Sequence, residues 1–150
     1  MPQSHAAVYV HWVFSTKQRQ PFLKDLNVRS QVHSALGGIA KRLECMPIIV
    51  GGVSDHVHML TTLSRNLKMS EAVKEFKRSS NNWIKENHPI DGFKWQAGYG
   101  AFSVSQSKLD AVKQYVSNQE EHHRTKSFKE EFRSLLTKHG LEIDEKYCWD

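Results

Sequence analysis

Two histidines separated by one apolar residue stand in the segment Asp55-His56-Val57-His58-Met59. Runs of apolar and small residues flank this segment, which is typical of a strand. Because side chains of a strand alternate between the two faces of a sheet, His56 and His58 point to one face and Val57 to the other. Two imidazoles about 6.5–7 Å apart at their Cα atoms can together bind a divalent metal ion. The alternative is a half-buried strand whose exposed face carries two inert histidines.

A tyrosine and a glutamine four residues apart, Tyr115 and Gln119, lie in the segment 107–122, where the apolar spacing predicts a helix. Residues four apart are neighbours on one helix face. A tyrosine hydroxyl has a pKa near 10, so at neutral pH it is a poor nucleophile unless it is helped. The alternative tyrosine nucleophiles, of which the first two lie in predicted strands and favour a packing role, are Tyr9, Tyr99 and Tyr147.

Basic residues dominate the charge of the chain, with a formal net charge of +5. This balance suits a polyanionic partner. The apolar spacing in the segment 70–87 predicts an amphipathic helix. Its polar face mixes cations with hydroxyl and amide groups, which suits binding to a phosphate backbone. The alternative is a helix face that is simply solvated. A polar loop at 15–21 adds two cations. The candidate DNA contacts are Lys17, Arg19, Lys74, Lys77, Arg78, Ser80 and Lys85.

The hydrophobic periodicity predicts eight elements in the order strand, helix, strand, strand, helix, strand, helix, helix. The last helix begins at a capping box of Ser127 and Glu130, and Gly140 stops it. Gly51 and Gly52 permit a bulge or bend between the second and third strands. The predicted strands cover 6–14, 47–53, 56–63 and 95–104, and the first three predicted helices cover 27–43, 70–87 and 107–122.

The first six elements match the split βαβ or ferredoxin-like plan of the α+β class, an antiparallel sheet with helices on one face. Extra helices follow at the C-terminal end. In this plan the third strand is internal, so His56 and His58 lie inside the sheet. A length of 150 residues fits one domain, 1–150.

Several protein classes are excluded by composition. No apolar run approaches the ~20 residues of a membrane helix, and no signal-peptide pattern is present. Cys45 and Cys148 show no metal-ligand spacing, and we interpret them as reduced thiols of a cytoplasmic protein. The sequence contains no G-x-x-x-x-G-K-[ST] phosphate loop.

The order of these motifs resembles the single-tyrosine HUH transposases of short bacterial insertion sequences, including relatives associated with repetitive extragenic palindromes. HUH denotes two histidines around an apolar residue. The resemblance implies that His56, His58 and Gln119 bind a divalent metal ion, Mg²⁺ or Mn²⁺, and that Tyr115 attacks DNA. The matching stretches are Tyr9–Lys17, Asp55–Leu60, Phe76–Ser80, Trp95–Tyr99 and Val112–Gln119.

The same resemblance implies cleavage and rejoining of single-stranded DNA at insertion-sequence ends through a 5′-phosphotyrosine. It also implies recognition of DNA hairpins and a homodimer whose active sites are shared between subunits. Two imidazoles and one amide oxygen are neutral, so the ion would keep its full positive charge for the phosphate.

Three other functions remain open. A rolling-circle replication initiator or relaxase-like nickase would use the same chemistry, although such proteins are usually longer. A non-catalytic nucleic-acid-binding module would keep the fold and leave the histidines inert. A hydrolytic zinc enzyme would need a carboxylate or a third histidine as a further ligand, and apart from Asp55 none lies near His56 and His58 in the sequence.

Overall fold

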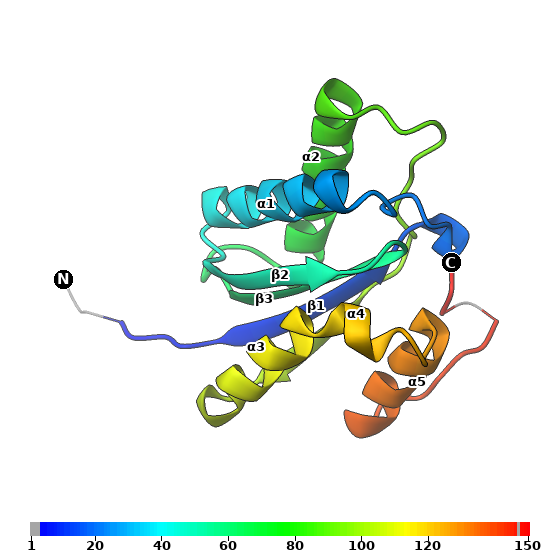
Figure 1. Ribbon diagram of the computed structural model, residues 1–150. Coiled ribbons are helices and arrows are strands. Elements are labelled where there is room, and N and C mark those ends of the chain that lie inside the picture. The colour runs from blue at the N-terminus through cyan, green and yellow to red at the C-terminus, as the bar shows by residue number, and fades with distance from the viewer. Residues whose placement is uncertain (1–3, 147) are drawn as a thin grey trace.

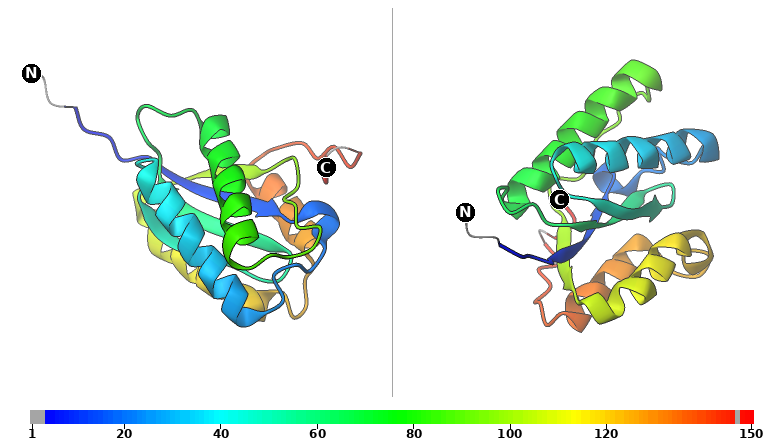
Figure 2. Two further views of the ribbon diagram at one scale, coloured as in Figure 1. Left: turned by 90° about the horizontal axis from the view of Figure 1, so that it is seen from above. Right: turned by 90° about the vertical axis from the view of Figure 1, so that its left-hand side faces the viewer.

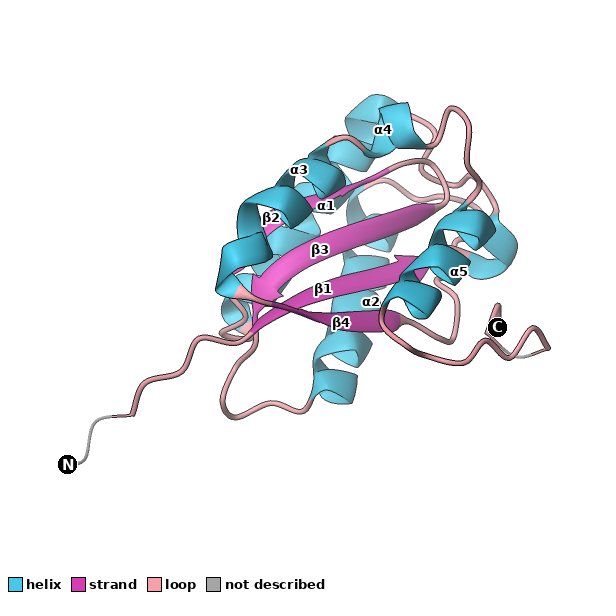
Figure 3. Ribbon diagram, turned by 90° about the horizontal axis from the view of Figure 1, so that it is seen from below, coloured by secondary structure: helices cyan, strands magenta, loops and turns pink. Residues whose placement is uncertain are grey.

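A four-stranded antiparallel sheet with the order β2-β3-β1-β4 forms the centre of the protein in a computed structural model, which describes residues 4–146 and 148–150 (Figure 1, Figure 3). Strand β3 pairs with β1 on one side and β2 on the other. The predicted ferredoxin-like α+β plan, with both histidines on an internal strand, is therefore confirmed. The strands are β1 (Tyr9–Ser15), β2 (Pro47–Gly52), β3 (His56–Thr62) and β4 (Gly100–Val104).

Helices cover both faces of this sheet. Helices α1 and α2 lie on one face, and the C-terminal helices α3, α4 and α5 lie on the other (Figure 1, Figure 2). None of the helices in the described part of the chain has the length and apolar character to cross a bilayer. The helices are α1 (Leu26–Arg42), α2 (Met69–Asn87), α3 (Leu109–Ser117), α4 (Gln119–His122) and α5 (Phe128–Lys138), with 3-10 turns η1 (Lys17–Arg19) and η2 (Gln106–Lys108).

Two predicted boundaries are wrong. Strand β4 begins at Gly100, because the segment 95–99 leaves the sheet after one isolated bridge between Trp95 and Thr16. The helix predicted over 107–122 is interrupted at Asn118, whose φ of −98° and ψ of 22° separate α3 from α4. Despite this break, Asn118 N–H still donates to the carbonyl of Gln114, so the two helices follow nearly the same path.

The main apolar core lies between the sheet and helices α1 and α2. Trp12, Phe14, Val57, Met59 and Phe76 are fully buried there. The rings of Trp12 and Phe76 meet edge to face at 5.3 Å. Each such side chain contributes roughly 1.5–3 kcal/mol on burial, so this face supplies most of the hydrophobic stabilisation.

A smaller apolar cluster holds α5 against the opposite face. Val13 and Phe102 of the sheet pack against α5, which Ser127 caps by accepting from Glu130 N–H as predicted. This packing fixes α5 against the sheet. Other α5 side chains that face the sheet between these apolar residues therefore also have defined positions. The α5 side chains in this cluster are Phe128, Phe132, Leu135 and Leu136.

Glycine allows α3 to pack directly on strand β2. A Cβ atom at Gly51 would lie only 2.6 Å from the carbonyl oxygen of Val116, so no larger residue fits without a shift of the helix. Gly51 is also the cross-strand partner of His58. The irregularity in the pairing of β2 with β3 lies between Pro47 and Ile49, while Gly52, with a φ of 149°, ends β2 where the chain bends toward β3. The role of Gly51 is therefore to bring α3, and with it Tyr115, close to the histidines.

Candidate active site

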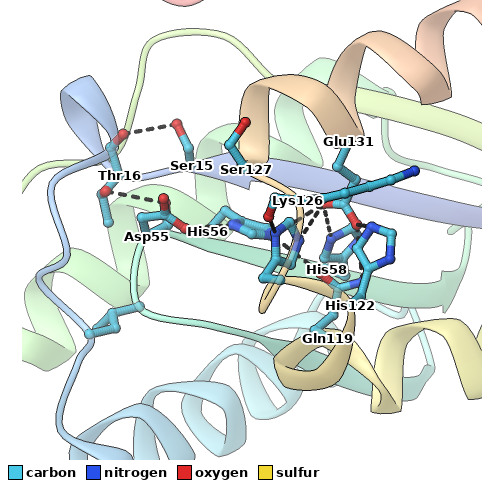
Figure 4. Close-up of polar contacts among 12 residues, drawn as sticks. Ser15, Thr16, Asp55, His56, His58, Gln119, His122, Lys126, Ser127 and Glu131 are labelled. Atoms are coloured by element: carbon cyan, nitrogen blue, oxygen red, sulfur yellow. Dashed lines mark hydrogen bonds and ion pairs between the residues drawn. The ribbon is translucent and has the colours of Figure 1, made fainter.

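The two histidines of β3 point toward helices α3, α4 and α5 and are completely buried. Their ring centroids are 5.2 Å apart. The Nε2 atoms of His56 and His58 lie 3.2 and 3.0 Å from the same oxygen, Oε1 of Glu131 (Figure 4). The two imidazoles thus converge on one point, as a shared ligand requires.

The outer nitrogens of both rings are held by other side chains. His56 Nδ1 lies 2.7 Å from a carboxylate oxygen of Asp55, and His58 Nδ1 lies 2.8 Å from Nε2 of His11. Such outer partners fix the orientation of a ligating imidazole and leave the other nitrogen for the metal. Asp55 directly precedes His56 in the sequence, whereas His11 comes from the neighbouring strand β1.

The predicted nucleophile and the predicted glutamine ligand reach the same point. Gln119 Oε1 is 3.2 Å from His56 Nε2, and Gln119 Nε2 donates to Glu131 Oε2 at 3.1 Å. The hydroxyl of Tyr115 also donates to Glu131 Oε2, and its ring centroid is 5.6 Å from that of His58. The structure therefore brings His56, His58, Tyr115 and Gln119 together within one chain.

Glu131, the residue at the centre of the cluster, was not identified from the sequence. Its side chain on α5 is only 2% exposed. His123 Nε2 approaches it at 3.1 Å and His122 Nε2 at 3.4 Å. A signal was present: Glu131 lies three residues after Phe128, on the apolar stripe of α5, where a carboxylate needs a buried partner.

The charges in the cluster follow from burial and from these contacts. Burial lowers the pKa of His58 to about 4. Burial also lowers the pKa of His56, but hydrogen bonds to Asp55 and Glu131 outweigh it and raise the value to about 9. Without a cation, His56 is therefore the imidazole that carries a proton on both nitrogens, and His58 is neutral.

Glu131 and Tyr115 have opposite protonation preferences. Burial alone would raise the pKa of Glu131, but hydrogen bonds from His123, His56 and His58 hold it well below its usual range. Burial and the nearby negative charge of Glu131 raise the pKa of Tyr115 above its ordinary value. Glu131 is therefore an ionised carboxylate and Tyr115 a neutral phenol.

The donor set suits a divalent metal ion. One ligand atom from each of His56, His58, His123 and Glu131 lies within 4.8 Å of all the others. Imidazole nitrogens and a carboxylate oxygen are the ligands of Mn²⁺ and Zn²⁺, and with oxygen ligands from a phosphate they accommodate Mg²⁺. Beside the neutral imidazoles and amide of the expected ligand set, the structure places one ionised carboxylate, that of Glu131.

A cavity of about 820 Å³ opens beside the nucleophile, between β4, α3 and α5. Tyr115, His122 and Glu131 line its inner wall. Its other walls include three lysines, so a polyanion could reach the hydroxyl of Tyr115 through it. These lysines are Lys108, Lys126 and Lys138.

The other tyrosines do not share this environment. Tyr9 begins β1 and pairs with Thr62 and Val104, and Tyr99 lies beside Lys77 near the other face of the sheet. Tyr147 lies outside the described residues. Within the described chain, Tyr115 is the tyrosine whose ring contacts His58.

Of the residues predicted to contact DNA, some are exposed to solvent and others already bind groups of the protein itself. Lys17, Lys74 and Lys85 are exposed. Two of the basic residues already have partners: Arg78 pairs with Glu75 at 2.7 Å, and Arg19 donates to the carbonyl of Trp149.

Two of the predicted DNA contacts are engaged inside the protein. Lys77 donates to the carbonyls of Gln96, Ala97 and Gly98. Ser80 is fully buried and accepts from the indole of Trp95. Both side chains fix the segment 95–99 to α2, so the structure does not offer them to DNA.

Two solved structures share the fold of this chain. A structure of a candidate transposase from Deinococcus radiodurans R1 is similar with a TM-score of 0.63 and 23% identity, covering 79% of this chain and 98% of that one. A REP-associated tyrosine transposase bound to a REP hairpin is similar with a TM-score of 0.60 and 12% identity, covering 82% of this chain and 74% of that one. These two likenesses concern the fold. No curated protein matches the chain.

The sequence itself matches a family profile. The profile described as "Transposase IS200 like" matches residues 4–119, which include β1 to β4, both histidines of β3, Tyr115 and Gln119. The match covers well over half of the chain and ends before His123 and Glu131. The chain therefore belongs to the family of IS200-like transposases.

Proposed function

We propose that the protein cleaves and rejoins single-stranded DNA at insertion-sequence ends through a covalent 5′-phosphotyrosine on Tyr115. The supporting observation is that the Tyr115 hydroxyl, both β3 histidines and Gln119 meet at Glu131 in one buried cluster. A non-catalytic binding module has no need to gather a tyrosine hydroxyl, several imidazoles and a carboxylate at one largely buried point, because removing such groups from water is costly even when they are paired.

Tyr115 supplies the nucleophile. Its Oη forms a bond to the scissile phosphorus while the bond from phosphorus to the 3′-oxygen breaks, which leaves a 5′-phosphotyrosine and a free 3′-hydroxyl. The phenol proton leaves along the hydrogen bond to Glu131 and passes to solvent, and the leaving 3′-oxygen takes up a proton from solvent, so the proton count is unchanged. A second 3′-hydroxyl reverses the reaction without ATP, since the phosphotyrosine retains the energy of the phosphodiester.

His56, His58 and Gln119 would hold a divalent cation, Mg²⁺ or Mn²⁺, together with Glu131 and His123. A bound cation polarises a phosphoryl oxygen and offsets negative charge near the attacking phenol. Within the chain, Asp55 and His11 orient the two β3 imidazoles, and Gln119 and Glu131 position the phenol.

Hairpin recognition is part of the proposal. The similar REP-associated transposase is bound to a REP hairpin, and we propose a folded single strand as the partner of this chain as well. The exposed cations Lys17, Lys74 and Lys85 would contact its phosphates, with smaller contributions from the paired Arg19 and Arg78.

A homodimer remains a prediction, and the structure bears on how its sites would be shared. Tyr115 contacts Glu131 and His58 of its own chain, so one chain holds every residue of the cluster. We propose that the tyrosine acts in cis. A mixture of Tyr115→Phe and His56→Ala variants should then form no covalent adduct, whereas an adduct from the mixture would show that the tyrosine acts in trans.

The nucleophile is tested with Mn²⁺ and labelled single-stranded element ends, followed by a denaturing gel. Wild type and the control Tyr9→Phe should form a covalent protein–DNA adduct. Tyr115→Phe should lose the adduct but retain DNA binding. An adduct that survives in Tyr115→Phe would overturn the assignment of the nucleophile.

A hydrolytic zinc enzyme deserves consideration because Glu131 and His123 provide the carboxylate and third histidine that the sequence lacked near the HUH motif. However, four protein ligands fill a tetrahedral zinc site and leave no position for a catalytic water. Removal of the metal ion from the assay distinguishes a transposase or nickase from a non-catalytic binding module. Under the transposase or nickase hypothesis, EDTA abolishes the adduct; the binding module forms no adduct in either condition.

A further inference from the structure

Four ligand atoms of the buried cluster lie at the spacing of a tetrahedral metal site. Oε1 of Glu131 is 3.2 Å from Nε2 of His56 and 3.0 Å from Nε2 of His58 (Figure 4). Nε2 of His123 is 3.1 Å from the same oxygen, and all four atoms lie within 4.8 Å of one another. Ligands that each lie about 2.0–2.1 Å from a tetrahedral Zn²⁺ ion are about 3.3 Å apart. Three imidazoles and one carboxylate thus form a complete zinc donor set.

Each imidazole of this set is held by an outer partner that leaves Nε2 for a metal. The Nδ1 atom of His123 lies 2.6 Å from the carbonyl oxygen of Lys126, to which it donates when it carries the proton. The Nδ1 atoms of His56 and His58 have the partners described above. Such partners orient ligating imidazoles and make them better ligands. The three imidazoles are therefore oriented before an ion binds.

The carboxylate is oriented in the same way. Its second oxygen, Oε2 of Glu131, accepts hydrogen bonds from Gln119 Nε2 at 3.1 Å and from the hydroxyl of Tyr115. These bonds leave Oε1 to the imidazoles. The four ligand side chains are at most 8% exposed, so protein groups enclose the point between them. Enclosure of an ion by four protein ligands is typical of structural zinc sites.

Coordination number distinguishes zinc from the cations that suit phosphoryl transfer. Four protein ligands complete the shell of Zn²⁺ in sites of this kind, so no position remains for a phosphoryl oxygen. Mn²⁺ prefers six ligands, and the same four side chains leave positions for Gln119 Oε1 and for a phosphate. Zn²⁺ also binds a given set of nitrogen and oxygen donors more tightly than Mn²⁺ does. We therefore expect Zn²⁺ to displace Mn²⁺ from this cluster.

We propose that His56, His58, His123 and Glu131 form a closed Zn²⁺ site, and that Zn²⁺ bound there inhibits the protein. The zinc ion has no position for the scissile phosphate, and the Tyr115 hydroxyl stays hydrogen-bonded to the carboxylate that holds the ion. The inhibition rests on the proposed function for the reaction that is blocked, whereas the closed site does not. Zn²⁺ is then an inhibitor that competes with Mn²⁺ and not a cofactor.

Co²⁺ reports the geometry of the site without any DNA chemistry, because tetrahedral Co²⁺ absorbs visible light far more strongly than octahedral Co²⁺. Wild type should give the intense tetrahedral band, and equimolar Zn²⁺ should remove it by displacing Co²⁺. Dimethyl phosphate, a small phosphodiester, should leave the band unchanged. A weak octahedral spectrum, or a band that dimethyl phosphate alters, would overturn the closed site.

Two variants test the identity of the third imidazole. His123→Ala should lose the intense band. The matched control His122→Ala should keep it, because Nε2 of His122 lies outside the set of four atoms, 3.4 Å from the other oxygen of Glu131. An intense band in His123→Ala, or its loss in His122→Ala, would refute the ligand assignment. If circular dichroism shows that a variant is unfolded, the wild-type spectra still decide the geometry.

Inhibition is measured with the adduct assay in Mn²⁺. Equimolar Zn²⁺ should abolish the wild-type adduct, and EDTA followed by excess Mn²⁺ should restore it. An adduct that persists with Zn²⁺, in a protein that gives the tetrahedral band, would contradict only the inhibition. A tetrahedral band in a protein that forms no adduct with Mn²⁺ would support the closed site and contradict only the proposed function.

Discussion

The two faces of the sheet perform different tasks although they share the same strands. In β3, Val57 and Met59 point into the apolar core under α1 and α2, while His56 and His58 point into the polar cluster under α3 to α5. All four side chains are completely buried. Burial alone therefore does not distinguish structural from functional residues here; what distinguishes them is the chemistry of the side chains that they meet.

The two faces of the sheet also differ in how much they contribute to the stability of the fold. The α1 and α2 face joins large apolar side chains with few polar atoms. The opposite face has a smaller apolar cluster and confines four imidazoles around one carboxylate, Glu131. Desolvated charges contribute little net stability even when paired. We therefore expect the first face to determine the free energy of unfolding and the second to determine metal and DNA chemistry.

Truncation of a core ring gives the largest expected effect. Phe76→Ala should lower the free energy of unfolding by about 3–5 kcal/mol, because it removes a fully buried ring that packs on Trp12. The measurement is urea unfolding in EDTA. The affinity of the folded protein for Mn²⁺ should be unchanged, because no atom of Phe76 lies on the polar face.

Phe132→Ala is the matched change on the other face. Phe132 is slightly exposed and belongs to the smaller cluster, so its loss should lower stability less than the loss of Phe76. It should nevertheless weaken Mn²⁺ binding, because α5 carries Glu131. If instead Phe76→Ala were the variant with impaired Mn²⁺ binding, the division of labour between the faces would be wrong.

The next largest effect is expected from the central carboxylate. Glu131→Gln should weaken Mn²⁺ binding about 10- to 100-fold, as the loss of well-ordered partners at a metal site does. Isothermal titration calorimetry measures this affinity directly. The control Glu130→Gln, on the exposed side of α5, should bind Mn²⁺ as wild type does.

The opposite result is equally informative. Glu131 occupies the point toward which the imidazoles converge, so a carboxylate that only competes with the cation would have to be displaced before binding. Tighter Mn²⁺ binding in Glu131→Gln would identify such a competitor and refute its assignment as a ligand.

The same division explains what the sequence could predict. The strand periodicity around His56 and His58 and the four-residue spacing of Tyr115 and Gln119 are local patterns, and they placed these residues well. Glu131 meets His58 across 73 positions of sequence, through an α5 orientation that depends on tertiary packing. No local pattern contains that information, although a carboxylate on an apolar stripe was a visible anomaly.

The smallest expected effect tests how α3 is positioned. Gly51→Ala should reduce the rate of adduct formation about tenfold, because the new methyl group collides with the backbone of Val116 and shifts Tyr115 from its place, and small displacements of reacting groups are costly. The control is Gly38→Ala in α1, where a Cβ meets no atom within 4 Å and alanine should stabilise the helix by up to about 1 kcal/mol. Adduct rates are compared by quenched time courses, and stability by thermal unfolding. If Gly51→Ala lost stability while its adduct rate stayed at the wild-type value, α3 would tolerate displacement, and the close packing on β2 would serve the fold rather than the placement of the nucleophile.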